Sequence, residues 1–256
     1  MVKHSTYLID SHVHVGQFMS FYISPIDLSQ LMNKIGVDYY AVSSTTMCDE
    51  DYQKVLSEIY ELIRLDGEKV LPVMWITPEG LKGNIAWFLE SNIPWRCLKI
   101  HPYLHPNDWK PDGEQIQEVI DIARELSLPL LIHTGNESYC CASRFEELYQ
   151  LNPDITVILA HGRPNKEAVR IAQNYNNVFI DSAFMSIREM KIFIDNDISH
   201  KLLWGTDMCI PKHFYPDVDL KIYYQNKLTE FSSICNEADY NSITYRNAAK
   251  IFKIIK

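Results

Sequence analysis

The chain has 256 residues, of which 46% are hydrophobic and 22% charged, and its formal net charge at pH 7 is −9. This composition is typical of a globular protein, and the length suits one large α/β domain. An acidic chain repels phosphate backbones, and no run of Lys and Arg suggests a basic patch, so the sequence argues against nucleic acid as a partner.

The N-terminal segment and the cysteines favour a cytoplasmic protein. The first residues contain no unbroken apolar run and no small-residue cleavage site, so we expect no signal peptide. No stretch approaches the roughly 18 apolar residues that a membrane span needs. The six cysteines form no Cys-x-x-Cys pair, and Cys140 and Cys141 are adjacent, so we expect reduced thiols.

Apolar, β-rich runs alternate with helical patterns along the chain. In chain order, strands are expected at residues 7–13, 37–43, 70–76, 96–100, 128–133, 155–160, 178–180 and 201–204. The helices between and after them are expected at residues 26–35, 51–64, 81–90, 114–126, 144–150, 166–174 and 187–194, and a helical tail begins near Ile222. Ser24 is the expected cap of the first helix, and Pro25 lies in its first turn.

Strands separated by helices imply βαβ crossovers and a parallel sheet. Eight such units close into a (β/α)8 TIM barrel, which we expect to form a single domain over residues 1–256. An open, doubly wound sheet is the second interpretation of the same pattern.

Metal-capable side chains stand at the ends of several expected strands. His12 and His14 are two residues apart on the first strand, so they share one face. The fifth strand ends at His133, the sixth is followed by His161, and the eighth is followed by Asp207. Barrel active sites lie at the carboxyl ends of the strands, so these five residues should meet at one mouth. Imidazole and carboxylate together bind divalent zinc, iron, manganese or cobalt.

Several ordered motifs resemble the amidohydrolase superfamily, and more narrowly its amidohydrolase-2 branch, which includes aminocarboxymuconate semialdehyde decarboxylase. They are Asp-Ser-His-Val-His (10–14), Leu-Lys-Ile-His-Pro (98–102), Ile-His-Thr-Gly (132–135), His-Gly (161–162), Gly-Thr-Asp (205–207) and the tail Arg-Asn-Ala-Ala-Lys-Ile-Phe (246–252). The resemblance implies that His12, His14, His133 and Asp207 touch a metal ion. It also implies that His161 lies beside the ion, as a general base or a ligand to a second ion, and that Asp207 takes a proton from the metal-activated water.

Lys99 ends the fourth expected strand, with Cys97 and His101 on its face and Leu98 and Ile100 on the other. It should therefore point into the barrel mouth. In binuclear members of the superfamily a lysine at this strand is carboxylated and bridges two metals. The Lys-x-His-Pro context is more similar to the branch that works with one ion, so we expect an unmodified Lys99 that meets a substrate anion. A structural ion pair is the alternative.

Three sets of residues are left open by the sequence. Asp10 lies two residues before His12, so it should share the inward face, either as an acceptor for an imidazole or as a polar member of a lower layer. Arg163 follows His161-Gly162 and is a candidate for binding a substrate carboxylate, with a solvated loop arginine as the alternative. Loop residues that could line the pocket are Tyr103, Trp109, Asn136 and Tyr139, whereas His4, His105, His200 and His213 are assigned no role.

The expected function is that of a metal-dependent hydrolase in which metal-activated water attacks a small polar amide, lactone or ester. Non-oxidative decarboxylation of a small carboxylated substrate on the same site is the second function, and a catalytically silent metal-binding barrel is the third. Zinc is the favoured ion, with one ion favoured over two. TatD-like nucleases share the His and Asp pattern but carry glutamate where this chain has Lys99. We expect a small-molecule substrate and no membrane partner, and assembly of identical chains stays open.

Overall fold

The computed structural model describes residues 7–83 and 85–254. Its strands form one sheet in the order β2-β1-β3-β4-β5-β6-β7-β8-β9. Neighbouring strands are parallel except in the hairpin of β1 and β2. The parallel strands are β1 (Ile9–Phe18), β3 (Tyr39–Ser44), β4 (Val70–Trp75), β5 (Cys97–Ile100), β6 (Leu130–His133), β7 (Val157–Ala160), β8 (Val178–Asp181) and β9 (Leu202–Leu203), and β2 is Phe21–Ile23.

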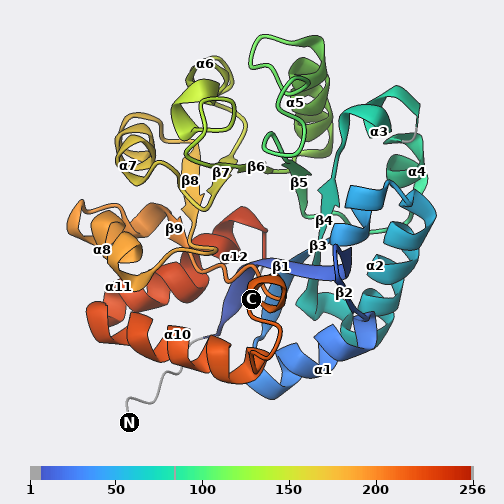
Figure 1. Ribbon diagram of the computed structural model, residues 1–256. Helices are drawn as coiled ribbons and strands as arrows, with labels where there is room; N and C mark the ends of the chain where they lie inside the picture. Colours follow the sequence, from blue (N-terminus) through green and yellow to red (C-terminus); the bar gives the residue numbers. More distant parts are fainter. Residues whose placement is uncertain (1–6, 84, 255–256) are drawn as a thin grey trace.

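The segment after β9 closes the sheet against β1 (Figure 1). The Ser11 N–H donates to the Trp204 carbonyl at 2.8 Å, and the Asp207 N–H donates to the His12 carbonyl at 2.9 Å. A parallel bridge between Val13 and Met208 continues this pairing. Eight parallel strands therefore form a closed barrel, which confirms the predicted (β/α)8 fold and excludes the open sheet.

Helices surround the barrel strands (Figure 1). They are α1 (Pro25–Ile35), α2 (Tyr52–Asp66), α3 (Pro78–Gly83), α4 (Ile85–Glu90), α5 (Glu114–Leu126), α6 (Glu146–Leu151), α7 (Asn165–Asn174), α8 (Ile187–Asp195), α9 (Pro211–Phe214), α10 (Leu220–Ile234), α11 (Glu237–Asn241) and α12 (Asn247–Ile251). Ser24 caps α1 as predicted, because its side chain accepts from the Asp27 N–H. None of the helices in the described residues is long and apolar enough to cross a membrane.

Some elements differ from the sequence expectation. The expected helix at residues 81–90 is divided between α3 and α4. The expected tail helix breaks at Cys235, whose backbone is extended, and restarts at Asn236, which caps α11. His4 lies outside the described residues.

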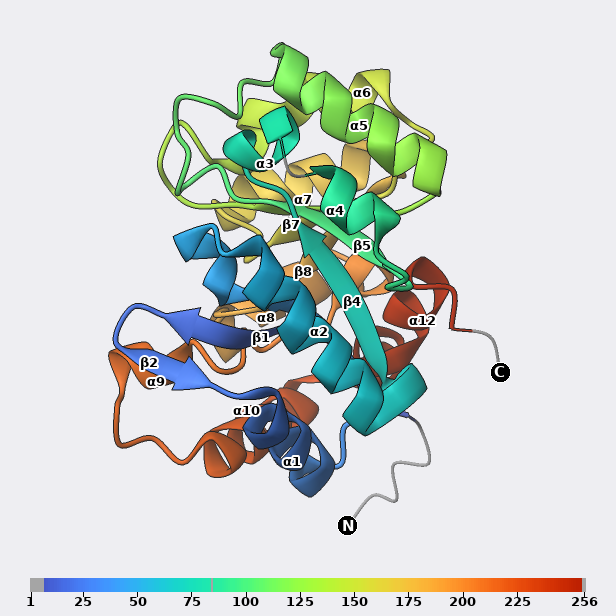
Figure 2. The same ribbon diagram turned by 90° about the vertical axis from the view of Figure 1, so that its right-hand side faces the viewer.

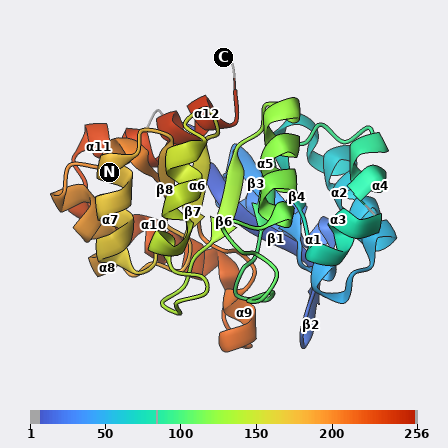
Figure 3. The same cartoon turned by 90° about the horizontal axis from the view of Figure 1, so that it is seen from above.

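The barrel interior is filled by an apolar cluster that draws residues from all eight parallel strands. The cluster includes Ile9 of β1, Leu131 of β6 and Leu203 of β9, and it continues into Ala248, Ile251 and Phe252 of the C-terminal segment. The helix α12 lies on the opposite side of the strands from α9 and β2 (Figures 2 and 3). The C-terminal segment therefore closes one end of the barrel, which leaves the carboxyl ends of the strands for the site.

We expect Phe252→Ala to lower the free energy of unfolding by about 3–5 kcal/mol, because its ring is only 1% exposed within this cluster and truncation leaves a cavity. Urea unfolding followed by circular dichroism measures the change. The matched control is Phe214→Ala. Because Phe214 is 59% exposed, this substitution should lower the free energy of unfolding by less than about 0.5 kcal/mol. Equal losses in the two variants would contradict the assignment of Phe252 to the barrel core.

Candidate metal centre

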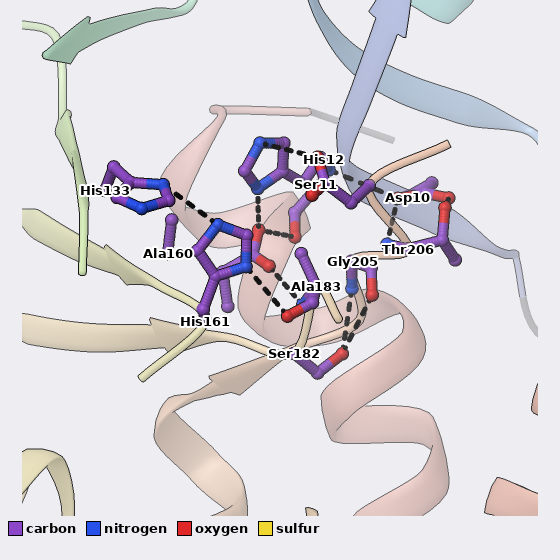
Figure 4. A network of polar contacts seen from close by, with 12 residues as sticks. Asp10, Ser11, His12, His133, Ala160, His161, Ser182, Ala183, Gly205 and Thr206 are labelled. Atoms are coloured by element: carbon purple, nitrogen blue, oxygen red, sulfur yellow. Dashed lines mark hydrogen bonds and ion pairs between the residues drawn. The ribbon is translucent and has the colours of Figure 1, made fainter. Parts of the chain in front are cut away.

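A β-bulge in β1 aims His12 into the barrel. The pairing register with β3 shifts between Asp10 and Val13, so Ile9 and His12, three residues apart, both face inward. Asp10 does not share that face. Its carboxylate accepts from the Thr206 hydroxyl at 2.6 Å and from the Thr206 and His12 N–H groups, and it lies away from the rings of His133 and His161 (Figure 4). The inward placement predicted for Asp10 is wrong, because the bulge breaks the alternation on which it rested.

Three buried side-chain atoms, two from β1 and one from the segment after β9, converge at the barrel mouth. His12 Nε2 lies 3.1 Å from His14 Nε2, and Asp207 Oδ1 lies 2.9 Å from His14 Nε2 and 3.4 Å from His12 Nε2. Ligand atoms at roughly 2.1 Å from a common ion lie about 3.0–3.4 Å apart in tetrahedral or octahedral geometry. The spacing of His12, His14 and Asp207 therefore fits a group that holds one divalent cation.

The contacts of the two Nδ1 atoms leave the Nε2 atoms of His12 and His14 as acceptors in this cluster. His14 Nδ1 lies 3.2 Å from the Ser43 carbonyl, which can only accept, so Nδ1 carries the proton and Nε2 a lone pair. His12 Nδ1 faces Asp181 Oδ2 at 3.4 Å, which gives the same tautomer. Burial, followed by the nearby Lys99 charge, lowers the pKa of His14 to about 3 and keeps it neutral. Two imidazole lone pairs and a carboxylate oxygen thus face one another, an arrangement that requires a cation.

Asp207 follows β9 in the left-handed region, with a φ of 60°, and its N–H is held by the His12 carbonyl. A non-glycine residue in this conformation is sparsely populated and is often found at functional sites. Burial alone would raise the pKa of Asp207, but its contacts with His12 and His14 hold that pKa well below its usual value. Asp207 is therefore an anion in the site.

Asp181, the last residue of β8, supports His12 from behind and was missed by the sequence analysis. It is fully buried, and it accepts from the Ser11 hydroxyl at 3.0 Å and from the Ala183 N–H at 2.6 Å. Burial acts to raise its pKa, but His12 outweighs this effect and the pKa is lowered. The strand-end pattern that pointed to His133 and Asp207 also applies to Asp181, and the predicted strand stopped one residue short of it.

His161 and His133 form a second pair beside His12 (Figure 4). His161 has a φ of 67°, and its Nδ1 donates to the Ala183 carbonyl at 2.9 Å. Its Nε2 consequently accepts from His133 Nδ1 at 3.1 Å. Burial lowers the pKa of His161 to about 4, so this pair is neutral at pH 7. The His161 ring lies 5.5 Å from the His12 ring, between centroids, which brings all five predicted residues to one mouth of the barrel.

Lys99 points into the same mouth, as the alternation predicted. Its Nζ lies 3.2 Å from His12 Nε2 and 3.4 Å from His14 Nε2, and 4.4 Å from the centre of the Trp75 ring. The side chain is only 2% exposed. Burial lowers its pKa to about 8, against the attraction of Asp207. Leu98 and Ile100, by contrast, pack in the outer cluster with the helices.

A stack of planar rings forms one wall of the site and was also missed. Trp75, His101 and His133 lie face to face, with centroid distances of 5.3 and 3.8 Å. Tyr103 lies 5.9 Å from His133, between centroids, and 6.1 Å from Tyr139, so two of the predicted loop residues border this wall. The other two do not share this position: Trp109 is fully buried in the outer core, and Asn136 is exposed.

Arg163 is tied to the backbone of neighbouring loops. Its Nη2 donates to the Phe184 carbonyl at 3.2 Å, and its N–H donates to the Thr134 hydroxyl at 2.9 Å. Ala183, next to Phe184, in turn accepts from His161. Arg163 therefore braces the loop that holds His161.

The comparisons with known proteins agree with this geometry. Residues 75–254 match the family described as Amidohydrolase, whereas no curated protein matches the chain. An uncharacterised TIM-barrel protein from Bordetella bronchiseptica is 14% identical with a TM-score of 0.72, over 96% of this chain and 98% of that one. A protein from Pseudomonas putida assigned as a 2-pyrone-4,6-dicarboxylic acid hydrolase is 12% identical with a TM-score of 0.70, over 98% and 99%.

A third structure adds a metal to the comparison. The 5-carboxyvanillate decarboxylase from Novosphingobium aromaticivorans, complexed with manganese and 4-hydroxy-3-methoxy-5-nitrobenzoic acid, is 10% identical with a TM-score of 0.66, over 98% of this chain and 97% of that one. At such identities these structures show a common fold. The family match covers more than two thirds of the chain. The chain therefore belongs to the amidohydrolase family, in the amidohydrolase-2 branch of metal-dependent enzymes that contains both hydrolases and decarboxylases.

Proposed function

We propose that the protein is a hydrolase of small amides, lactones or esters that uses water as the nucleophile. His12, His14 and Asp207 would hold one divalent ion, which would supply the Lewis acidity for this reaction. The observation that carries this proposal is the convergence of three acceptor atoms that lie within 4.8 Å of one another. His133 is a further candidate ligand through Nε2, since its Nδ1 is engaged by His161. When bound, the ion supplies Lewis acidity, which polarises a carbonyl group and makes water a nucleophile near neutral pH.

Zinc suits this set of imidazole and carboxylate ligands, and manganese is the first alternative. We propose a single ion because the Lys-x-His-Pro context favours an unmodified Lys99, whose ammonium group would place a cation, not a bridging carboxylate, beside the three ligands. A second ion there would have to overcome the repulsion of that ammonium group.

The residues around the ligands are arranged to accept protons. Both imidazole contacts of Asp207 use Oδ1, so Oδ2 is left to take a proton from the attacking water. His161 and His133 form a neutral pair that can take the next proton and return it to the leaving group. Hydrolysis needs an acceptor for a proton of the attacking water before the leaving group is protonated, whereas decarboxylation needs no such acceptor before the bond to carbon dioxide breaks. This supply of acceptors favours hydrolysis.

Decarboxylation of a small carboxylated substrate is the second candidate, because Lys99 is a buried cation in contact with the ligand atoms. Its ammonium group, with Arg163 at the adjacent loop, would bind a substrate carboxylate. A panel of esters, lactones and carboxylated aromatic acids, assayed with zinc-loaded and manganese-loaded protein, separates the two reactions. Within this proposal the protein acts in the cytoplasm on a small molecule, without nucleic acid or membrane partners.

We expect both His12→Ala and Asp207→Asn to lower the bound metal to a small fraction of one ion per chain and to abolish turnover, because each removes one of three converging ligands. Elemental analysis together with the substrate panel measures both effects. His200→Ala is the matched control, since His200 is exposed and should keep metal and activity. Near-normal turnover in either variant after its metal has been lost would exclude metal-dependent hydrolysis.

We expect His161→Ala to keep most of the metal but to lose about 10²-fold or more in kcat, because His161 acts on protons beside the ion. The measurement compares metal content and kcat in the same preparation. Loss of metal as complete as in His12→Ala would instead make His161 a ligand.

We expect Asp181→Asn to weaken zinc binding by about 10–100-fold without removing the site, because Asp181 orients His12 but does not touch the ion. The dissociation constant is measured by competition with a chelating dye. An unchanged constant would show that the contact with His12 does not fix its tautomer.

A further inference from the structure

Two cations have access to the same acceptor atoms in this site. Each imidazole directs its Nε2 atom into the site, at His12 and at His14, because both Nδ1 atoms face acceptors. These are the atoms proposed to hold the divalent ion. Lys99 Nζ lies within 3.2 and 3.4 Å of the same two atoms, so its N–H groups are directed at the same lone pairs.

The surroundings hold the Lys99 ammonium group at this position. The centre of the Trp75 ring lies 4.4 Å from Nζ, and His101 stacks on Trp75. Lys99 is 2% exposed, so its side chain is almost completely removed from bulk water. The negative groups nearest to it are those of the site itself, with Asp207 exerting the strongest attraction.

We propose that Lys99 competes with the divalent ion for His12 and His14, so that the site binds metal more weakly than its ligands alone would allow. This inference rests on the proposed metal site and concerns its affinity, which is a property separate from the reaction. Two effects act in the same direction. The ammonium group donates hydrogen bonds to lone pairs that the ion needs, and its charge repels the ion through a buried, poorly screened medium.

The opposite role for Lys99 makes the opposite prediction. A carboxylated lysine that bridges two ions is a ligand, so its removal would weaken binding and lower the number of bound ions. A structural ion pair with Asp207 that leaves the lone pairs untouched would give little change in affinity. The sign of the change in affinity therefore distinguishes the three roles.

The test measures Zn²⁺ and Mn²⁺ dissociation constants of the full-length protein by chelator competition, for the wild type, Lys99→Met and Lys99→Gln. Both variants remove the charge and keep an unbranched side chain, one apolar and one polar. Lys201→Met is the matched control: Lys201 is also buried, but its Nζ donates to the Ala172 and Tyr175 carbonyls and it precedes β9, at the other end of the barrel. Circular dichroism and thermal unfolding of the apo forms establish that each variant is folded.

We expect both Lys99 variants to bind Zn²⁺ at least about tenfold more tightly than the wild type, with one ion per chain, and Lys201→Met to match the wild type. Equal or weaker binding in a folded Lys99 variant would overturn the competition while leaving the metal site in place. A wild type and folded Lys99 variants that all bind no divalent ion would overturn the proposed site as well as the competition.

Discussion

The closure of the barrel between β1 and the segment after β9 is the constraint on which the site depends. The Asp207 N–H is fixed on the His12 carbonyl, and Thr206 is fixed on Asp10, so the carboxylate of Asp207 is held against both imidazoles of β1. The same β1 residues that complete the sheet thus bring together ligands nearly 200 positions apart in the chain. The hydrogen bonds between β1 and the segment after β9 fix the backbone of the site. They therefore hold the ligand atoms of His12, His14 and Asp207 close together in spite of their mutual repulsion.

Burial gives this geometry its chemical character. The interior lowers the pKa of His14 and His161, so their nitrogens are lone-pair acceptors at neutral pH, while Asp207 stays ionised. An acceptor-rich, water-poor cluster has a strong requirement for positive charge. The protein supplies part of that charge itself, through Lys99, and a divalent ion would supply the rest. The balance between these two cations links metal affinity to the charge available for a substrate anion.

Much of this arrangement was predictable from local sequence patterns. The alternation of apolar runs and helical periods indicated all eight parallel strands, and strand-end placement brought the five predicted residues to one mouth. The face of the sheet on which the Asp10 side chain lies was not predictable. The bulge in β1 depends on pairing with distant residues and does not change the alternation of apolar and polar residues in the sequence. Strand β2 is only three residues long, too short for any periodic signal. The contact of Asp181 with His12 depends on the packing of β8 beside the closing segment.

The most direct measurement of the central claim is an anomalous difference map from crystals of the zinc-loaded protein, collected on both sides of the zinc absorption edge. We predict one anomalous peak per chain, within about 2.2 Å of His12 Nε2, His14 Nε2 and Asp207 Oδ1, and electron density for an unmodified Lys99. A peak elsewhere, or two peaks from ions that a carboxylated Lys99 bridges, would contradict the proposed single-ion site.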